Sequence, residues 1–298
     1  MTPSDAFPAG RVPDLQALAG GAAVAASALA RSARWAVPDA GLRFDLAWPD
    51  VPAPAGGFPL LVVTDANAMF ATLVEAARLQ SLRPDVTGVS APVILGIGHD
   101  IDGPFDAALR ARDYAPSGAA GLLDRLSDVL AGLERSLPLA RDRRTLIGHS
   151  LGGLFVLETL FTRPDLFAAF VAASPSIWWD RAAVRHGADR LPDRLEHTGA
   201  RVRLLLTAGG CERGAPQVSP VSRPANALPQ GPATADAQTL RLAERRVVEE
   251  VEALADRLAG AERDRLKVDV HIFEGETHGS VIPCALGRAV RFACEDPS

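Results

Sequence analysis

The stretch Thr145-Leu-Ile-Gly-His-Ser-Leu-Gly-Gly153 constrains the fold of this chain more than any other. Its first three residues favour a strand, and apolar residues recur at helical spacing from Leu151 onward. Between these two patterns lies Gly148-x-Ser150-x-Gly152. The glycines permit a strained strand-to-helix turn, because a Cβ at either position would collide with the neighbouring segment. The stretch therefore predicts a serine held at the crest of a sharp turn.

A serine in this position is suited to nucleophilic catalysis. The turn also points the N-terminus of the new helix, and the backbone N–H of Leu151, at the place where an oxyanion would develop. The bare pattern is weak evidence, because a chain with 26 Gly in 298 residues should contain it by chance about 0.1 times. The alternative is a glycine-rich turn with a solvent-facing serine. The strand before Ser150 and the helix after it favour the nucleophile.

Composition limits the class of protein. The chain is long enough to bury a large core, and we expect residues 1–298 to form one α/β domain. A net charge of −5 argues against a nucleic-acid partner, because nothing offsets repulsion by phosphates. The three cysteines are an odd number without metal-ligand spacing, so the sequence predicts neither a disulfide framework nor a metal site.

The N-terminus needs separate treatment. We expect residues 1–35 to be an arm or the first strand of the fold. The run from Ala17 to Ala30 imitates a signal peptide, but it lacks a basic start and is too short to span a bilayer. We therefore expect a soluble, cytoplasmic protein without a membrane partner, with the periplasm as the alternative location.

Apolar runs alternate with helical patterns along the chain. We expect residues 102–117 to be irregular and residues 213–237, which are rich in Pro, Ala and Gly, to form a flexible insertion. The alternation predicts a mostly parallel twisted sheet with helices on both faces, and an antiparallel edge pair near the N-terminus. The predicted strands are 42–48, 60–64, 92–97, 145–147, 168–173, 202–207 and 268–273, and the predicted helices are 69–79, 122–133, 151–161, 240–258 and 281–293.

The strand ends select a base for the serine. In an open α/β sheet, functional residues gather beyond the carboxyl ends of the strands. His278 lies in the loop after the last predicted strand, and we expect it to be the general base. His99 also ends a strand and is the alternative base. His186 and His197 lie in polar segments, where we expect solvated connections.

Glu212 is the predicted acid of a triad, because it follows the strand 202–207 and lies between the serine and His278 in the chain. It would accept the Nδ1 proton of His278 and hold the imidazole in the tautomer that can deprotonate Ser150. Three alternatives stay open. Glu212 could be an exposed carboxylate paired with Arg213, the Ser–His pair could act without an acid, or the acid could be one of two nearby carboxylates, Glu274 and Glu276.

The second oxyanion donor should come from the loop after the strand 60–64. The backbone N–H of Asn67 is the candidate, and its side chain could cap the helix that begins nearby.

Four residues are candidates for substrate binding. Trp178 and Trp179 follow a strand end, where their rings could stack on an aryl or acyl group or pack under the strand. Arg110 and Arg112 could meet an anionic substrate, or one of them could pair with Asp113.

With these residues assembled, the chain resembles the esterase family that includes the enterobactin and salmochelin trilactone esterases, a branch of the α/β-hydrolases. The resemblance covers roughly Leu42 to Phe292 and implies Ser150 as nucleophile, His278 as base and Glu212 as acid. The chain departs from the family at Ala66, where glycine is common, and at Ala115, where threonine is usual. The matching stretches are Thr64-Asp-Ala-Asn-Ala-Met-Phe70, Gly96-Ile-Gly98, Asp102-Gly-Pro-Phe-Asp106, Arg110-x-Arg-Asp-Tyr-x-Pro116, Gly148-His-Ser-Leu-Gly-Gly153, Ser174-Pro-Ser-Ile-Trp-Trp179 and His278-Gly-Ser-Val-Ile-Pro283.

The resulting hypothesis is a serine esterase that works through an acyl-enzyme and needs no metal or organic cofactor. The resemblance suggests the lactone or ester bonds of a catecholate siderophore as the substrate. A general carboxylesterase, a thioesterase or an acyltransferase with the same triad is the alternative. A rival of another class is a binding protein that uses the scaffold without catalysis. The oligomeric state stays open.

Overall fold

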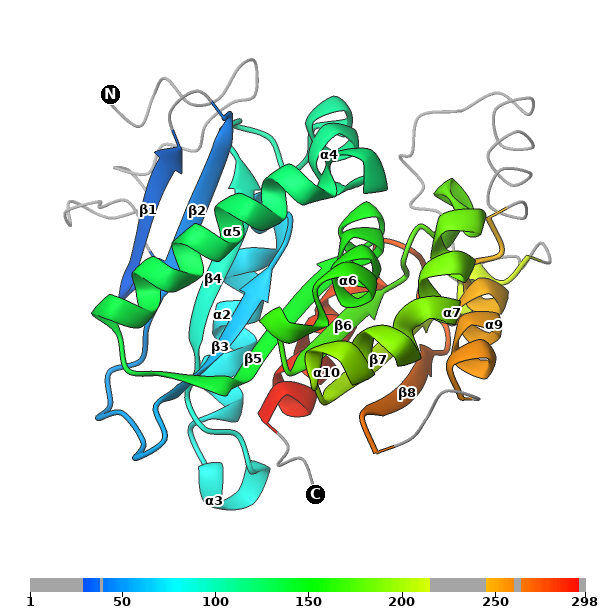
Figure 1. Cartoon of the computed structure of the whole chain (residues 1–298). Coiled ribbons are helices and arrows are strands. Elements are labelled where there is room, and N and C mark those ends of the chain that lie inside the picture. The colour runs from blue at the N-terminus through cyan, green and yellow to red at the C-terminus, as the bar shows by residue number, and fades with distance from the viewer. Residues whose placement is uncertain (1–28, 38–39, 215–244, 260–263, 295–298) are drawn as a thin grey trace, which may run out of the picture.

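Eight strands form one mixed sheet in the computed structural model, which describes residues 29–37, 40–214, 245–259 and 264–294 (Figure 1). The strand order is β1-β2-β4-β3-β5-β6-β7-β8. Both of the first two pairings, β1 with β2 and β2 with β4, are antiparallel, and all pairings from β4 through β3 to β8 are parallel. The strands are β1 Ser32–Val37, β2 Leu42–Ala47, β3 Phe58–Val63, β4 Val93–His99, β5 Leu139–His149, β6 Ala169–Ala173, β7 Val202–Gly209 and β8 Leu266–Phe273.

The sheet confirms the predicted mostly parallel architecture with an antiparallel edge pair at the N-terminal side. Each predicted strand is present, and the strand leading to Ser150 begins six residues earlier than expected, at Leu139. The first strand, β1, overlaps the end of the segment 1–35. Residues 1–28 of the predicted arm and residues 215–237 of the predicted insertion lie outside the described residues.

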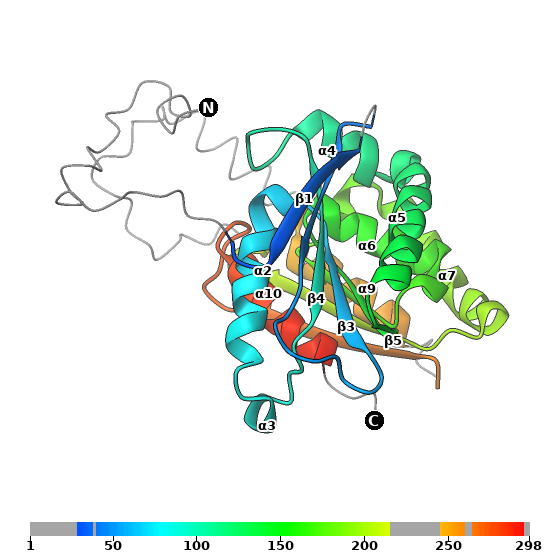
Figure 2. The ribbon, with the colours of Figure 1, turned by 90° about the vertical axis from the view of Figure 1, so that its left-hand side faces the viewer.

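Helices cover both faces of the sheet, as expected (Figure 2). Alternate residues of β3 belong to two separate apolar cores: Leu60 and Val62 pack with α5, α6, α7 and α9, whereas Leu61 and Val63 pack with α2 and α10. This alternation follows from the period of two in a strand. The helices are α2 Ala66–Gln80, α3 Pro84–Thr87, α4 Ala107–Tyr114, α5 Pro116–Ser136, α6 Leu151–Thr162, α7 Arg181–Thr198, α9 Val247–Ala259 and α10 Val281–Cys294.

Two helices contradict the sequence-based expectations. The segment 102–117, expected to be irregular, contains α4 and the first two residues of α5. The segment that carries His186 and His197, expected to be a polar connection, is the 18-residue helix α7. The predicted helix 240–258 is described from Val247 onward as α9, and residues 240–244 lie outside the described part. Within the ranges that the structure covers, every helix is too short or too polar to cross a lipid bilayer.

Candidate active site

Ser150 lies at a strained turn between β5 and α6. Its backbone adopts φ 59° and ψ −118°, a conformation that side-chain-bearing residues rarely adopt. The flanking glycines make the turn possible, because a Cβ on Gly148 would lie 2.2 Å from the carbonyl oxygen of Gly152, and a Cβ on Gly152 would lie 2.2 Å from Oγ1 of Thr64. The structure therefore has the predicted sharp elbow.

Glu212 and His278 contact each other directly. The Nδ1 atom of His278 lies 2.6 Å from Oε2 of Glu212. Glu212 closes the short 3-10 turn Gly210–Glu212 after β7, and it is buried. Its other oxygen, Oε1, accepts hydrogen bonds from the Ser174 hydroxyl at 2.5 Å and from the Gly209 N–H at 2.9 Å. Both carboxylate oxygens of Glu212 are therefore held in place.

These contacts set the protonation of the pair. Burial by itself raises the pKa of the Glu212 carboxyl, but hydrogen bonds from His278, Ser174 and the Gly209 N–H outweigh burial and lower that pKa below its ordinary value. An ionised Glu212 can only accept hydrogen bonds, so Nδ1 of a neutral His278 carries the proton. The lone pair of Nε2 is then free to accept a proton, as a general base must.

Arg213, considered as a partner of Glu212, and Glu274, considered as the acid, make other contacts. Arg213 pairs with Glu252 at 3.3 Å and with Glu274 at 3.9 Å, and not with Glu212. The side chain of Glu274 is 77% exposed. Of the carboxylates considered, the structure brings Glu212 to the imidazole of His278.

His278 lies beside the elbow. Its ring centroid is 4.5 Å from that of His149, the residue that precedes Ser150. Burial, followed by the nearby charge of His278, lowers the pKa of His149 to about 3, so His149 is neutral at ordinary pH. The Ser150 hydroxyl itself lies 3.3 Å from the hydroxyl of Ser176. The structure thus brings His278, the predicted base, to the elbow, while the hydroxyl of Ser150 contacts a second serine.

The two predicted oxyanion donors begin two different helices. Leu151 is the first residue of α6, and Asn67 lies in the first turn of α2. The N–H groups of a first helical turn have no intrahelical acceptor, so both are available to a ligand. The helix-capping alternative for the Asn67 side chain is wrong: its amide donates to the carbonyls of His99, Ile101 and Gly103 at 3.1 to 3.2 Å. The residue at the N-cap of α2 is Asp65.

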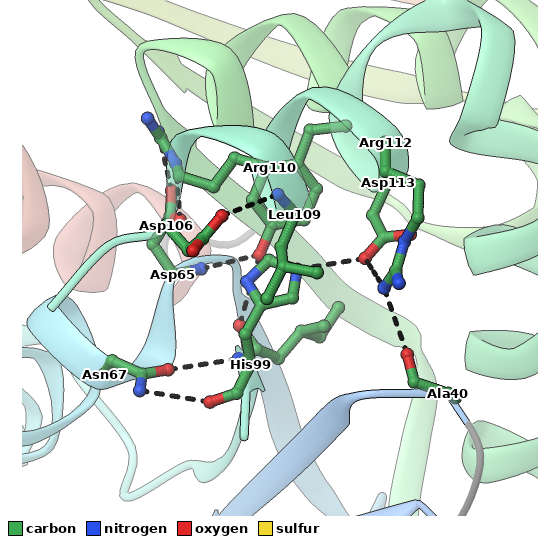
Figure 3. A network of polar contacts seen from close by, with 11 residues as sticks. Ala40, Asp65, Asn67, His99, Asp106, Leu109, Arg110, Arg112 and Asp113 are labelled. Carbon is green, nitrogen blue, oxygen red and sulfur yellow. Dashed lines mark hydrogen bonds and ion pairs between the residues drawn. The ribbon is translucent and has the colours of Figure 1, made fainter. Parts of the chain in front are cut away.

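The two candidate arginines occupy one polar network (Figure 3). Arg112 pairs with Asp113 at 2.7 Å and donates to the Ala40 carbonyl, which is the alternative raised for one of the arginines. Arg110 makes a two-point contact with Asp65. His99, the alternative base, is buried, and its Nε2 lies 2.9 Å from Asp113. His99 is therefore committed to a different carboxylate from the one that holds His278.

The two tryptophans differ in their exposure to solvent. Trp178 packs against the core, and the guanidinium of Arg245 lies 4.5 Å from the centre of its ring. Trp179 is 47% exposed. Trp179 is the more exposed of the pair.

Sequence reasoning missed two serines of this site. Ser174 holds Glu212 and Ser176 contacts Ser150, and both are buried. The signal was present, because Ser174-Pro-Ser176 directly follows β6 and therefore lies at the functional edge of the sheet.

A cavity of about 930 Å³ lies at the opposite edge. Its walls include the starts of β6, β7 and β8, at Ala169, Val202 and Leu266, together with residues 141–145 of β5, and none of the site residues. Over the described part of the chain, no three His, Cys, Asp or Glu side chains are grouped so that they could hold a metal ion.

Comparisons with known proteins agree with this architecture. Residues 40–243 match a family described as "Putative esterase". The ferri-bacillibactin esterase BesA of Bacillus subtilis is 31% identical over 82% of this chain and 82% of its own length. The siderophore triacetylfusarinine C esterase of Aspergillus fumigatus is 30% identical over 84% of this chain and 86% of its own length.

Among solved structures, the BES protein from Bacillus cereus superposes with a TM-score of 0.77 at 28% identity, covering 91% of this chain and 98% of that one. The family match spans more than half of the sequence, and both the sequence relatives and the structural relative extend over most of its length. The chain therefore belongs to this esterase family and is a carboxylic ester hydrolase of the α/β-hydrolase fold.

Proposed function

We propose that the chain is a serine esterase that cleaves ester bonds of a siderophore through an acyl-enzyme. The observation that carries the proposal is the 2.6 Å contact between His278 and the buried Glu212, beside an elbow that presents Ser150. A hydroxyl nucleophile is weak at its own pKa and needs an adjacent, oriented base, and this arrangement supplies one.

The chemistry follows from the placement of each group. The Ser150 hydroxyl turns from Ser176 and attacks the ester carbonyl, while Nε2 of His278 takes its proton. The N–H groups of Leu151 and Asn67 donate to the oxyanion. His278 then gives the proton to the departing alcohol, and water releases the acyl group by the same steps in reverse order. Glu212 stabilises the transient imidazolium.

The substrate assignment comes from the relatives and from exposed aromatic surface. Two relatives that match over most of this chain are named esterases of ferri-bacillibactin and of triacetylfusarinine C. In this chain, Trp179 is 47% exposed and Phe105 is 44% exposed. Flat aromatic side chains of this kind suit a bulky, partly aromatic ligand.

A fluorophosphonate probe tests the reaction type. We expect the wild-type protein to be labelled at Ser150 and the Ser150→Ala variant to remain unlabelled, with peptide mass spectrometry locating the adduct. Folded wild-type protein that resists the probe would overturn the serine-esterase mechanism and favour the binding-protein alternative.

A product assay tests the substrate. Wild-type protein is incubated with ferri-bacillibactin, with triacetylfusarinine C and with p-nitrophenyl butyrate, and the products are followed by mass spectrometry and absorbance. We expect ring-opened siderophore products with at least one of the first two, and none with Ser150→Ala. Intact siderophores beside rapid release of p-nitrophenol would identify a general carboxylesterase instead.

A further inference from the structure

Arg110 holds the residue from which the oxyanion loop starts. Its Nε lies 2.8 Å from Oδ1 of Asp65, and its Nη2 lies 3.0 Å from Oδ2 (Figure 3). The guanidinium thus grips both carboxylate oxygens, a geometry that fixes orientation as well as distance. The two residues are 45 positions apart in the chain, so the contact ties α4 to the loop after β3.

The loop that Arg110 holds is strained at Asp65. Asp65 has φ 52° and ψ 45°, the left-handed conformation, and it is followed by α2 with Asn67 in its first turn. Its own N–H donates to the hydroxyl of Tyr114 at 3.1 Å. The Asp65 side chain makes no capping bond to α2, and its carboxylate and its N–H contact Arg110 and Tyr114 of α4 instead. Contacts from α4 therefore maintain the left-handed conformation.

The same carboxylate lies against the serine elbow. Oδ2 of Asp65 is 3.1 Å from the position that a Cβ on Gly152 would occupy, and Nη2 of Arg110 lies 3.5 Å from the carbonyl oxygen of His149. A displacement of Asp65 would therefore change the distance between the Asn67 N–H and the elbow. The Asn67 N–H and the elbow are the two groups between which an oxyanion would lie.

Because the Asp65 carboxylate is buried, it needs the guanidinium of Arg110 to stay ionised in its position. The Asp65 side chain is 2% exposed and that of Arg110 is 15% exposed. Burial raises the pKa of Asp65, and the charge and hydrogen bonds of Arg110 oppose that rise. Without the guanidinium, the carboxylate would have to take up a proton or leave its position.

We propose that Arg110 is a positioning residue for catalysis: by clamping Asp65 it sets the distance of the Asn67 N–H from the oxyanion. The inference rests on the proposed serine-esterase function. In this role Arg110 acts through Asp65, which engages its Nε and Nη2 atoms, and not by meeting an anionic substrate. A small misplacement of an oxyanion donor weakens the transition state more than the bound substrate.

The main test is Arg110→Lys, which keeps the charge and loses the two-point grip. We expect kcat on p-nitrophenyl butyrate to fall about 10- to 100-fold and KM to change less than about threefold. The rate of fluorophosphonate labelling should fall in the same proportion as kcat/KM, because the phosphoryl oxygen needs the same donors. The matched control is Arg257→Lys, since Arg257 grips Asp189 in the same two-point way at 2.6 Å on the exposed surface of α9.

A second variant covers the case in which Arg110→Lys does not fold. Arg110→Gln combined with Asp65→Asn removes both charges, so no carboxylate remains unpaired in the interior. We expect this protein to fold by circular dichroism and to show the same fall in kcat. Wild-type kcat in a folded form of either variant, with only a lower Tm, would overturn the positioning role.

Fluorophosphonate labelling separates the role of Arg110 from the serine-esterase mechanism. Wild-type protein that the fluorophosphonate does not label would remove the serine-esterase mechanism. Wild-type protein that is labelled, beside an Arg110→Lys variant labelled at the same rate, would remove the role of Arg110 alone.

Discussion

Glu212 accepts hydrogen bonds on both carboxylate oxygens, and these bonds determine how a substitution of Glu212 should affect kcat. We expect Glu212→Gln to lower kcat about 10²- to 10⁴-fold, because the amide can donate to Nδ1 and favour the wrong tautomer of His278. Steady-state kinetics on p-nitrophenyl butyrate measure the loss. Glu274→Gln, which changes an exposed carboxylate near the same loop, should keep wild-type kcat. An equal loss in both variants would contradict the assignment of Glu212 as the acid.

His149 should make the protein sensitive to mild acid. Its pKa is about 3 in the folded protein, below the ordinary value of 6.5, so the unfolded chain binds the extra proton between those values. The stability from keeping His149 neutral is complete above pH 6.5 and is lost as the pH falls towards 3. We expect the free energy of unfolding to decrease by about 1.4 kcal/mol per pH unit over that window.

The variant His149→Phe isolates this effect. Phenylalanine keeps a ring against His278 and does not titrate, and Nε2 of His149 has no hydrogen-bond partner within the described residues. Urea unfolding at pH 7.5 and at pH 5.0 should show a smaller difference for the variant than for the wild type. Measurements above pH 5 avoid the window of Glu212, whose lowered pKa places its own loss of stability below 4.5. Identical pH dependence in both proteins would rule out the buried neutral histidine.

The sequence allowed the prediction of residues whose position follows from the end of a single strand. It did not allow the prediction of residues whose role depends on a contact between two segments that are distant in the chain. Ser150, Glu212 and His278 each follow a recognisable strand. Arg110 is different, because its partner Asp65 is reached only through the tertiary fold. Its neighbours in sequence are charged, and this made the segment resemble an exposed loop.

At the scale of elements, the elbow between β5 and α6 depends on the absence of side chains. We expect Gly148→Ala to lower the free energy of unfolding by more than about 2 kcal/mol, because the new Cβ would lie 2.2 Å from a backbone oxygen that cannot easily move. Gly121→Ala in α5 is the control. Apart from its chain neighbours and the backbone of its own helix, no atom of the described residues lies within 4 Å of its added Cβ, and alanine should stabilise that helix by roughly 0.5–1 kcal/mol. Thermal unfolding of both variants checks the opposite signs.

The helices α4 and α7 show why some elements could not be predicted. The first has a single buried residue, Tyr114, so it presents almost no apolar stripe. The second does carry a signal, because Val184, Ala188, Leu191 and Leu195 are buried at helical spacing behind the N-cap Asp180. Its many charged residues hid that spacing. The strands were predicted more reliably, since continuous apolar runs identify strands covered on both faces.

At the scale of the whole molecule, the site is assembled from strands that differ in how well they are shielded from solvent. The serine follows the central strand β5, whereas His278 follows β8, which among the described strands pairs with β7 alone and is partly exposed along most of its length. We expect amides of β8 to exchange with deuterium faster than those of β6, and activity to decline at lower urea concentrations than the loss of helix signal. Hydrogen exchange by mass spectrometry measures the first, and equal protection of β6 and β8 would contradict it.

The position of the donors has a stereochemical consequence. The Asn67 N–H comes from α2 on one face of the sheet and the Leu151 N–H from α6 on the other, while the imidazole approaches from the β8 side. In the proposed mechanism these directions admit the hydroxyl to one prochiral face of the carbonyl. The alcohol oxygen of the bound ester should therefore lie on the β8 side, within reach of the protonated imidazole.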